Sequence, residues 1–268
     1  MKKLQLLLLA CLAFANTYAQ KLPGVQQAGL RAPANIKIDG KTNEWGGFKA
    51  RNTATDVSYT IANDDKKLYL VIHAEESIVA NRAVTGGIRL LVQTSGSKSI
   101  QDAKGIKFPF FEQGFRIVFP VKKYREVNTP AEGDSIMKVY NQMIASNVKW
   151  IYTKGIAGVD SVIAVYNDKG MEAAGAFDQN RGYTCEMAID LALLGLDADK
   201  AKPFAYNITI NPAGPGKMSA PGLTFRGMNG DGSMMTEQQS EGFNLNFQKQ
   251  NNVTYATTDF WGEYTLAK

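Results

Sequence analysis

The chain has 268 residues, of which 44% are hydrophobic and 21% are charged, and its formal net charge is +5. This length is enough for one large domain with a sizeable core. Basic and acidic residues are interspersed and no long basic block occurs, so we expect no nucleic-acid partner.

Residues 1–19 have the anatomy of a secretory signal peptide. A lysine pair precedes the apolar stretch Leu4–Ala15, and Thr17-Tyr18-Ala19 offers a small-residue cleavage site. The apolar stretch is shorter than the ~20 residues that a membrane-spanning helix needs. Cys11 lies in the middle of it, which favours plain secretion over a lipid anchor. We therefore expect export to the periplasm, the cell surface or the exterior.

After a flexible lead-in over residues 20–34, residues 35–268 are expected to form a single domain. Short segments in which apolar and polar side chains alternate follow one another, with turn signals between them. The expected strands are residues 35–40, 56–62, 68–74, 88–94, 115–121, 148–152, 159–166, 171–177, 183–189, 204–210 and 260–266. This pattern predicts an all-β fold, an antiparallel β-sandwich with one or two short helical turns.

Tyr183–Leu196 is expected to be a core strand that runs directly into a capped turn of helix. Asp190 offers a carboxylate to the first free N–H groups of that turn, and Gly195 can end it in the left-handed conformation. Cys185 lies on the apolar side of the strand and is the only cysteine once residues 1–19 are removed. We expect a small buried side chain rather than a reactive thiol.

Three segments are less regular. Residues 136–145 could form a strand or a short helix, and the pattern leaves both open. Residues 95–107 and 211–252 are polar, contain glycine and exceed normal loop lengths. Loops this long inside a compact domain are usually functional or disordered.

Several different short motifs follow one another along the chain. Ile36-Lys37-Ile38-Asp39-Gly40 with Asn43-Glu44-Trp45 comes first, and residues 65–72 follow. Tyr183–Ile189 with Leu193–Leu196 comes third, and Trp261–Leu266 closes the series. In order and spacing these motifs resemble family 9 carbohydrate-binding modules and the wider DOMON-like group of β-sandwich domains, over residues 35–268.

The resemblance implies a secreted β-sandwich that binds glycans, in some relatives together with structural calcium. Other DOMON-like domains hold haem. Relatives grip the sugar between aromatic rings on loops, and one ring is expected after the second strand of the first hairpin. Ala74–Arg89 occupies that place here and contains no aromatic residue.

Trp150 and Tyr152 are the candidates for ligand contact because they share one face of an expected strand. Two such rings can stack on the apolar face of a sugar with little loss of entropy. The alternative is that both rings belong to the sandwich core. Tyr124, which is near in sequence, and Arg226, in the long segment 211–252, complete the predicted contact set. Trp45 and Trp261 are expected to serve packing.

Few residues are candidates for metal binding or catalysis. His73 is the only histidine and lies mid-strand, which favours an ordinary strand residue over a triad base or a haem ligand. Asn229–Ser233 is similar to the start of a calcium loop, but Met234 and Ser240 replace the glycine and glutamate that an EF-hand requires. Asp39 and Glu44 could cap a turn or bind a metal, so the sequence leaves structural calcium open.

These observations predict a secreted, non-catalytic domain that recognises carbohydrate at the cell envelope. The first alternative is a glycoside hydrolase with two facing carboxylates, although no catalytic motif nominates a pair. The second is an envelope scaffold that contacts other envelope proteins and has no small ligand. A deep acidic cleft would favour the hydrolase, and a large exposed apolar patch would favour the scaffold.

Overall fold

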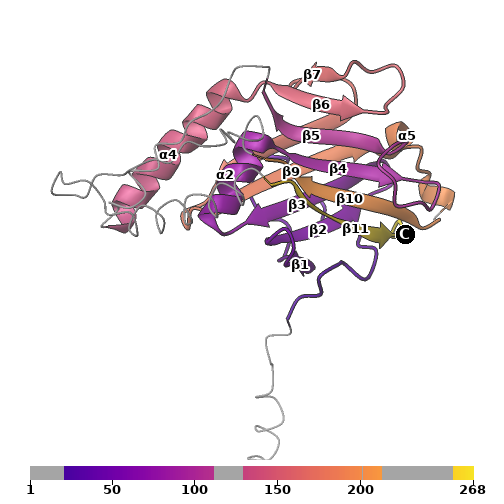
Figure 1. The fold of residues 1–268 in the computed structure, drawn as a ribbon, viewed down its shortest axis with the longest axis horizontal. Helices are drawn as coiled ribbons and strands as arrows, with labels where there is room; N and C mark the ends of the chain where they lie inside the picture. The colour runs from indigo at the N-terminus through magenta and orange to yellow at the C-terminus, as the bar shows by residue number, and fades with distance from the viewer. Residues whose placement is uncertain (1–20, 112–128, 201, 213–255) are drawn as a thin grey trace, which may run out of the picture.

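The computed structural model describes residues 21–111, 129–200, 202–212 and 256–268. In these residues two antiparallel β-sheets pack face to face around one main core (Figure 1). The strand order is β1-β2-β3-β9-β8 in the first sheet and β11-β10-β4-β5-β6-β7 in the second. The antiparallel β-sandwich that the alternation predicts is therefore confirmed.

Most strand boundaries lie within a few residues of the expected ones. The first sheet contains β1 (Ala50–Asn52), β2 (Val57–Asn63), β3 (Lys67–Ala74), β9 (Tyr183–Asp190) and β8 (Met171–Phe177). The second sheet contains β11 (Thr258–Tyr264), β10 (Phe204–Ile210), β4 (Ile88–Gln93), β5 (Lys104–Phe110), β6 (Trp150–Lys154) and β7 (Val162–Ala164). The expected strand at residues 35–40 is absent, and β1 and β5 are strands that the alternation did not reveal. The predicted signal peptide and the expected strand 115–121 lie outside the described residues.

The core lies between the sheets and follows the period of two. In β3 and β9 the register places Leu70 opposite Met187 and Ile72 opposite Cys185, and all four side chains are fully buried. Ile208 of β10 comes from the second sheet and is buried in the same core. Each such side chain contributes roughly 1.5–3 kcal/mol by leaving water, so the alternation determines which face of each strand turns inward.

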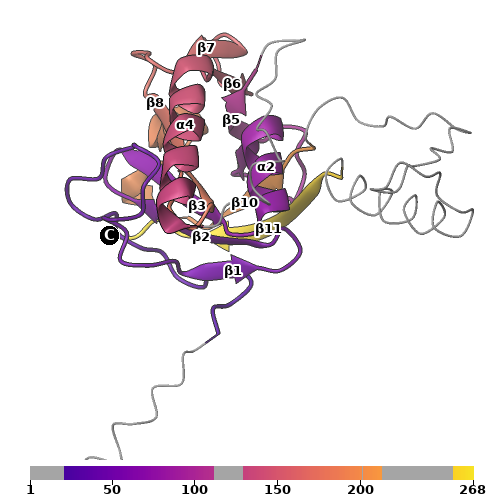
Figure 2. The same ribbon diagram turned by 90° about the vertical axis from the view of Figure 1, so that its left-hand side faces the viewer.

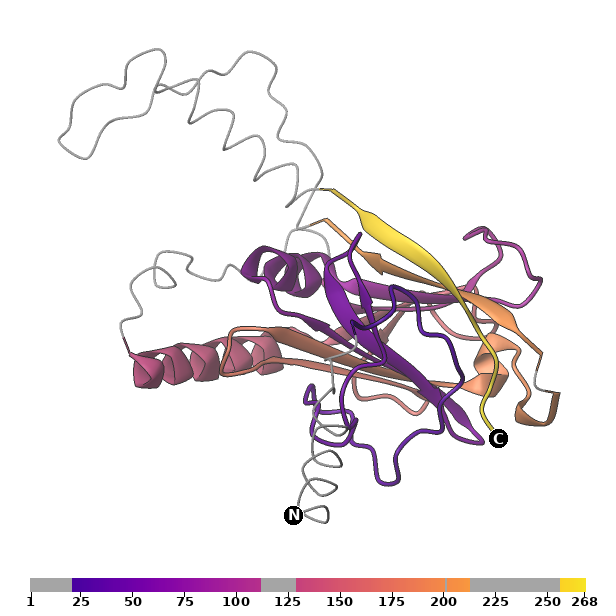
Figure 3. The same ribbon diagram turned by 90° about the horizontal axis from the view of Figure 1, so that it is seen from below.

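Two helices lie at one end of the sandwich and are longer than the short turns expected. They are α2 (Ser77–Gly86) and α4 (Pro130–Asn147), while α5 (Leu191–Leu194) and η1 (Ala198–Lys200) are single turns. Figures 2 and 3 show α2 and α4 at the same end of the two sheets. In the described part of the chain, no helix combines the length and the apolar character that crossing a membrane requires.

The segment left open between strand and helix, residues 136–145, belongs to α4. The Thr129 hydroxyl caps this helix by accepting a hydrogen bond from the Glu132 N–H, and Pro130 stands in the first turn. Met137, Tyr140 and Ile144 then recur with helical spacing and form the buried face. The cap and this spacing together favour a helix over a strand.

The outer face of the first sheet is covered by residues 30–48 of the N-terminal segment, which crosses it in Figure 3. Trp45 packs there against Tyr69 and Val71, and all three are buried. β3 therefore buries both of its faces, which explains its nearly continuous apolar sequence.

The lead-in, which was expected to be flexible, makes specific contacts with the sandwich in its described part, residues 21–34. The Gln26 side chain donates to the Ile61 carbonyl and accepts from the Ile61 N–H, at 2.8 and 2.9 Å. The polar composition of this segment predicted a loop, but the Gln26 side chain forms hydrogen bonds with the backbone of β2.

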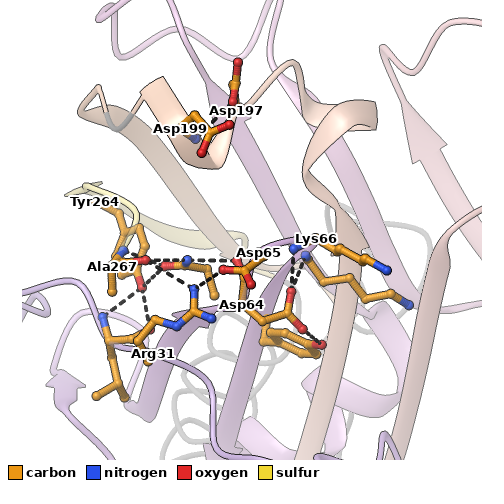
Figure 4. A network of polar contacts seen from close by, with 12 residues as sticks. Arg31, Asp64, Asp65, Lys66, Asp197, Asp199, Tyr264 and Ala267 are labelled. Carbon is orange, nitrogen blue, oxygen red and sulfur yellow. Dashed lines mark hydrogen bonds and ion pairs between the residues drawn. The ribbon is translucent and has the colours of Figure 1, made fainter.

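Both ends of the domain meet at the β2–β3 turn (Figure 4). Arg31 forms an ion pair with Asp65 at 2.8 Å, and the Ala267 N–H donates to the Asn63 side-chain oxygen at 2.8 Å. The Tyr264 hydroxyl donates to either the Leu30 carbonyl or the Asn63 oxygen, each 3.0 Å away. These contacts fix the first and last described segments against the same hairpin.

Cys185 is expected to be unreactive in the folded protein. Its side chain is fully buried in β9, and burial raises the pKa of the thiol well above its usual value, so the nucleophilic thiolate is scarce. With the chain that begins at Gln20, a thiol reagent such as DTNB should label Cys185 rapidly in urea and not in buffer. Equal labelling rates in the two conditions would contradict the core position of β9.

Candidate functional site

The outer side of the second sheet carries a row of four side chains across four strands; the one on β10 is fully buried and the other three are partly exposed. The register of β10, β4, β5 and β6 places Thr209, Arg89, Lys107 and Tyr152 directly opposite one another in succession. Paired residues point to the same side of a sheet, and neighbouring strands are ~4.8 Å apart. The four side chains therefore form one continuous row across the sheet.

Three aromatic rings lie at the β5–β6 end of this row. Trp150 is two residues from Tyr152 on β6, so both point outward, while Ile151 between them is fully buried in the core. Phe110 pairs with Trp150 after an irregularity in β5, and its ring centroid is 5.5 Å from that of Tyr152. All three rings are partly exposed. We call Phe110, Trp150 and Tyr152 the ring strip.

Lys107 lies against the ring strip. Its ammonium nitrogen is 4.8 Å from the centroid of Phe110 and 5.7 Å from that of Tyr152, a cation–π arrangement. Burial, together with the nearby charge of Arg89, lowers the pKa of Lys107. Among the described residues, no carboxylate lies within ion-pair distance of this ammonium group.

The hydrogen-bonding capacity of the Arg89 guanidinium group is only partly used by the described residues. Its Nη2 donates to the Thr209 hydroxyl at 3.0 Å, but its Nε is buried and has no hydrogen-bond partner in the described part of the chain. Asp259 of β11 pairs with Thr209 of β10 and so extends the row by one strand. Its carboxylate accepts a hydrogen bond from the Asn207 side chain at 2.7 Å. Burial lowers the pKa of Arg89, and the negative charge of Asp259 opposes this effect.

Two of the four predicted contact residues are thus brought together on one outer face. Trp150 and Tyr152 lie there and not in the sandwich core, which was the alternative reading. Tyr124 and Arg226 lie outside the described residues. The structure adds Arg89 and Lys107, which the sequence interpretation did not nominate.

Arg89 and Lys107 differ in how clearly the sequence indicates their positions. Arg89 alternates with Ile88 and Leu90, so its outward direction could be predicted from the strand pattern. Lys107 fell at the end of the polar segment 95–107, which was expected to be a loop. Its neighbour Phe110 lies in β5, whose sequence contains Gly105 and Pro109 and does not look like a strand.

A hollow of about 540 Å³ lies between α4 and the end of β8. Its lining includes the charged residues Asp134, Lys138 and Asp178. The Asn141 side chain bonds to the Phe177 backbone nitrogen and oxygen at 2.7 and 2.8 Å and so ties the helix to the strand. The Phe177 ring is only 6% exposed, so the hollow offers no open ring for stacking.

His73 is an ordinary strand residue in the first sheet. Its ring stacks on Phe48 with centroids 5.7 Å apart, and its Nδ1 lies 3.0 Å from the Thr184 hydroxyl. Asp178 is 3.7 Å from Nε2 and opposes the lowering of the His73 pKa by burial. Thr184 is itself buried, so this contact has no access to a substrate. Over the described residues, no group of three or more His, Cys, Asp or Glu side chains could hold a metal ion.

The three tryptophans have different environments. Trp45 is buried, as the packing interpretation predicts, and its indole N–H donates to Glu186. Trp261 pairs with Asn207 on the outer face of the second sheet and is partly exposed. Trp150 remains as the tryptophan of the ring strip.

No family model matches the sequence, and no curated protein matches it. Two solved structures that match this chain are a family 9 carbohydrate-binding module from Caldicellulosiruptor kristjanssonii in complex with cellotriose and the same kind of module in complex with glucose. Each is 10% identical in sequence and matches 89% of this chain. The matches cover 92% and 94% of those chains, with TM-scores of 0.40 and 0.36.

Proposed function

We propose that this chain is an exported, non-catalytic domain that binds carbohydrate at the cell envelope, and that the ring strip is its contact surface. The observation that supports this most directly is the grouping of Phe110, Trp150 and Tyr152 as partly exposed rings on one sheet face. Sugars present apolar C–H faces that stack on such rings, while their hydroxyl groups reach polar neighbours.

The three rings project from a rigid part of the fold. β5 and β6 are paired strands, so the backbone positions that carry the rings are fixed before a ligand binds. The hollow between α4 and β8 is the weaker candidate, because its only ring, Phe177, is buried. The sequence features of a signal peptide support export.

Replacing Trp150 by alanine is expected to weaken glycan binding at least tenfold while leaving the domain folded. The ring is partly exposed, so its loss removes contact area for the ligand and opens no cavity in the core. Binding of the chain from Gln20 onward should be measured first on a glycan array and then by calorimetry. Thermal unfolding of the variant reports whether the fold is retained.

Tyr166→Ala is the matched control, because this ring is 92% exposed and lies outside the strip. It should leave affinity unchanged, whereas Tyr152→Ala should weaken binding as Trp150→Ala does. The proposal is wrong if the intact domain binds no glycan on the array. It is also wrong if a bound glycan is held equally well by the Trp150→Ala protein.

A further inference from the structure

Two positive charges face each other on the candidate surface. Arg89 of β4 and Lys107 of β5 are directly opposite in the register, and the charge of Arg89 adds to burial in lowering the pKa of Lys107. Like charges opposite each other on paired strands destabilise a sheet. In the described part of the chain neither side chain forms an ion pair with a carboxylate. The acid in the same row, Asp259, lies beyond Thr209 and is bonded to Asn207.

Both charges are also partly removed from water. The Lys107 ammonium group sits over Phe110 and Tyr152, and the Arg89 Nε is buried with no hydrogen-bond partner among the described residues. Desolvation of a charge is costly unless an opposite charge or a hydrogen-bond acceptor compensates it. An anion that contacts both the guanidinium and the ammonium groups would offset this cost.

We propose that the carbohydrate recognised by this face is acidic, and that Arg89 and Lys107 bind its carboxylate or sulfate group while the ring strip stacks on the sugar. The guanidinium group presents donors in a planar fork that matches two oxygens of such an anion, and the lysine adds a point charge. This inference rests on the proposed function and specifies its ligand class.

The other charged residues near this face leave the charge around the ring strip positive. Lys154 lies in the next row, opposite Gly105, and its ammonium group donates to the Gln101 carbonyl. Glu263 on β11 forms an ion pair with Lys98 at 3.6 Å. Arg89, Lys107 and Lys154 thus place three cations on the outer side of β4, β5 and β6. The acids Asp259 and Glu263 are on β11.

The test compares polysaccharides that share a backbone and differ in charge. Dextran sulfate is paired with dextran, and polygalacturonate with its methyl ester, at physiological ionic strength so that weak surface attraction is screened. The intact domain should bind at least one charged member at least tenfold more tightly than its neutral partner. Which charged member binds shows whether the anion is a sulfate or a carboxylate.

Lys107→Met keeps most of the apolar stem over the rings and removes the charge, so it should weaken acidic-glycan binding at least fivefold. Arg89→Gln should do the same, and thermal unfolding of both variants shows that they are folded. Lys66→Met is the control, since Lys66 is exposed in the β2–β3 turn of the other sheet. It removes the same charge and should change affinity less than twofold.

Three results would overturn this inference, and they differ in what they leave standing. Equal binding of charged and neutral partners, abolished by Trp150→Ala, would reject the acidic ligand and retain the proposed function. An equal loss of binding in Lys66→Met and Lys107→Met would show only non-specific attraction to a basic protein. The absence of binding to any polysaccharide, here and on the glycan array, would reject both proposals.

Discussion

Replacing Glu186 by alanine is expected to lower the free energy of unfolding by about 3 kcal/mol, because it removes the acceptor of three hydrogen bonds, two of them buried and one partly buried. The Trp45 indole N–H donates to one carboxylate oxygen at 2.7 Å. The backbone N–H groups of Asp39 and Gly40 donate to the other at 2.9 and 2.7 Å. Glu186 belongs to β9 and is fully buried under the N-terminal segment.

The effect is large because the alanine variant leaves three donors without their acceptor, and two of these donors are buried. Leaving a buried donor unpaired costs about 1–3 kcal/mol, although relaxation of the segment will recover part of the sum. Burial raises the pKa of Glu186, and the three hydrogen bonds oppose that shift. The carboxylate is therefore tolerated here mainly because it accepts these hydrogen bonds.

Urea unfolding followed by tryptophan fluorescence measures the difference. Glu263→Ala is the control, because its carboxylate is on a strand, is largely exposed and, among the described residues, forms an ion pair with Lys98, so a change within about 0.5 kcal/mol is expected. Trp45→Phe removes one donor and keeps a large ring, and should cost less than Glu186→Ala. A loss below about 1 kcal/mol for Glu186→Ala would show that the three contacts do not hold the N-terminal segment in place.

The network around Glu186 also explains which parts of the fold the sequence could predict. Alternation revealed most strands, because the core face of β8, β9 or β10 is determined by a period of two within a single segment. The covering of the first sheet could not be read in this way. It depends on contacts between Trp45 or Gly40 and Glu186, more than a hundred residues apart, which local patterns do not encode.

The candidate site shows the same division between local and distant information. The pairing of Trp150 and Tyr152 on one face followed from their spacing on a strand. Arg89 and Lys107 meet only through the register of β4 and β5, which the sequence does not state. β5 itself was hidden because Gly105 and Pro109 are unusual inside a strand.

Replacing Gly262 by alanine is expected to destabilise the domain by about 3 kcal/mol or more, through overlap with a ring that cannot move away. Gly262 pairs with Tyr206 across β11 and β10, and an added methyl group would overlap the Tyr206 ring and hydroxyl. The Tyr206 hydroxyl is held at 2.8 Å from that of Tyr59, which in turn accepts the Gln26 N–H at 3.1 Å. Gly262 lies in the closing motif of the chain, so this contact gives that motif a packing role.

A double-mutant cycle distinguishes this overlap from a general intolerance of alanine in β11. Tyr206→Leu shortens the side chain and should be destabilising on its own, since it leaves a cavity and removes a buried hydrogen bond. In that background Gly262→Ala should cost much less than in the wild-type chain, because the overlapping atoms are gone. Gly24→Ala, where a methyl group meets no atom within 4 Å, should be close to neutral. Equal costs of Gly262→Ala in both backgrounds would mean that the Tyr206 ring does not limit the size of the side chain at position 262, and that β10 and β11 pack differently from the arrangement described.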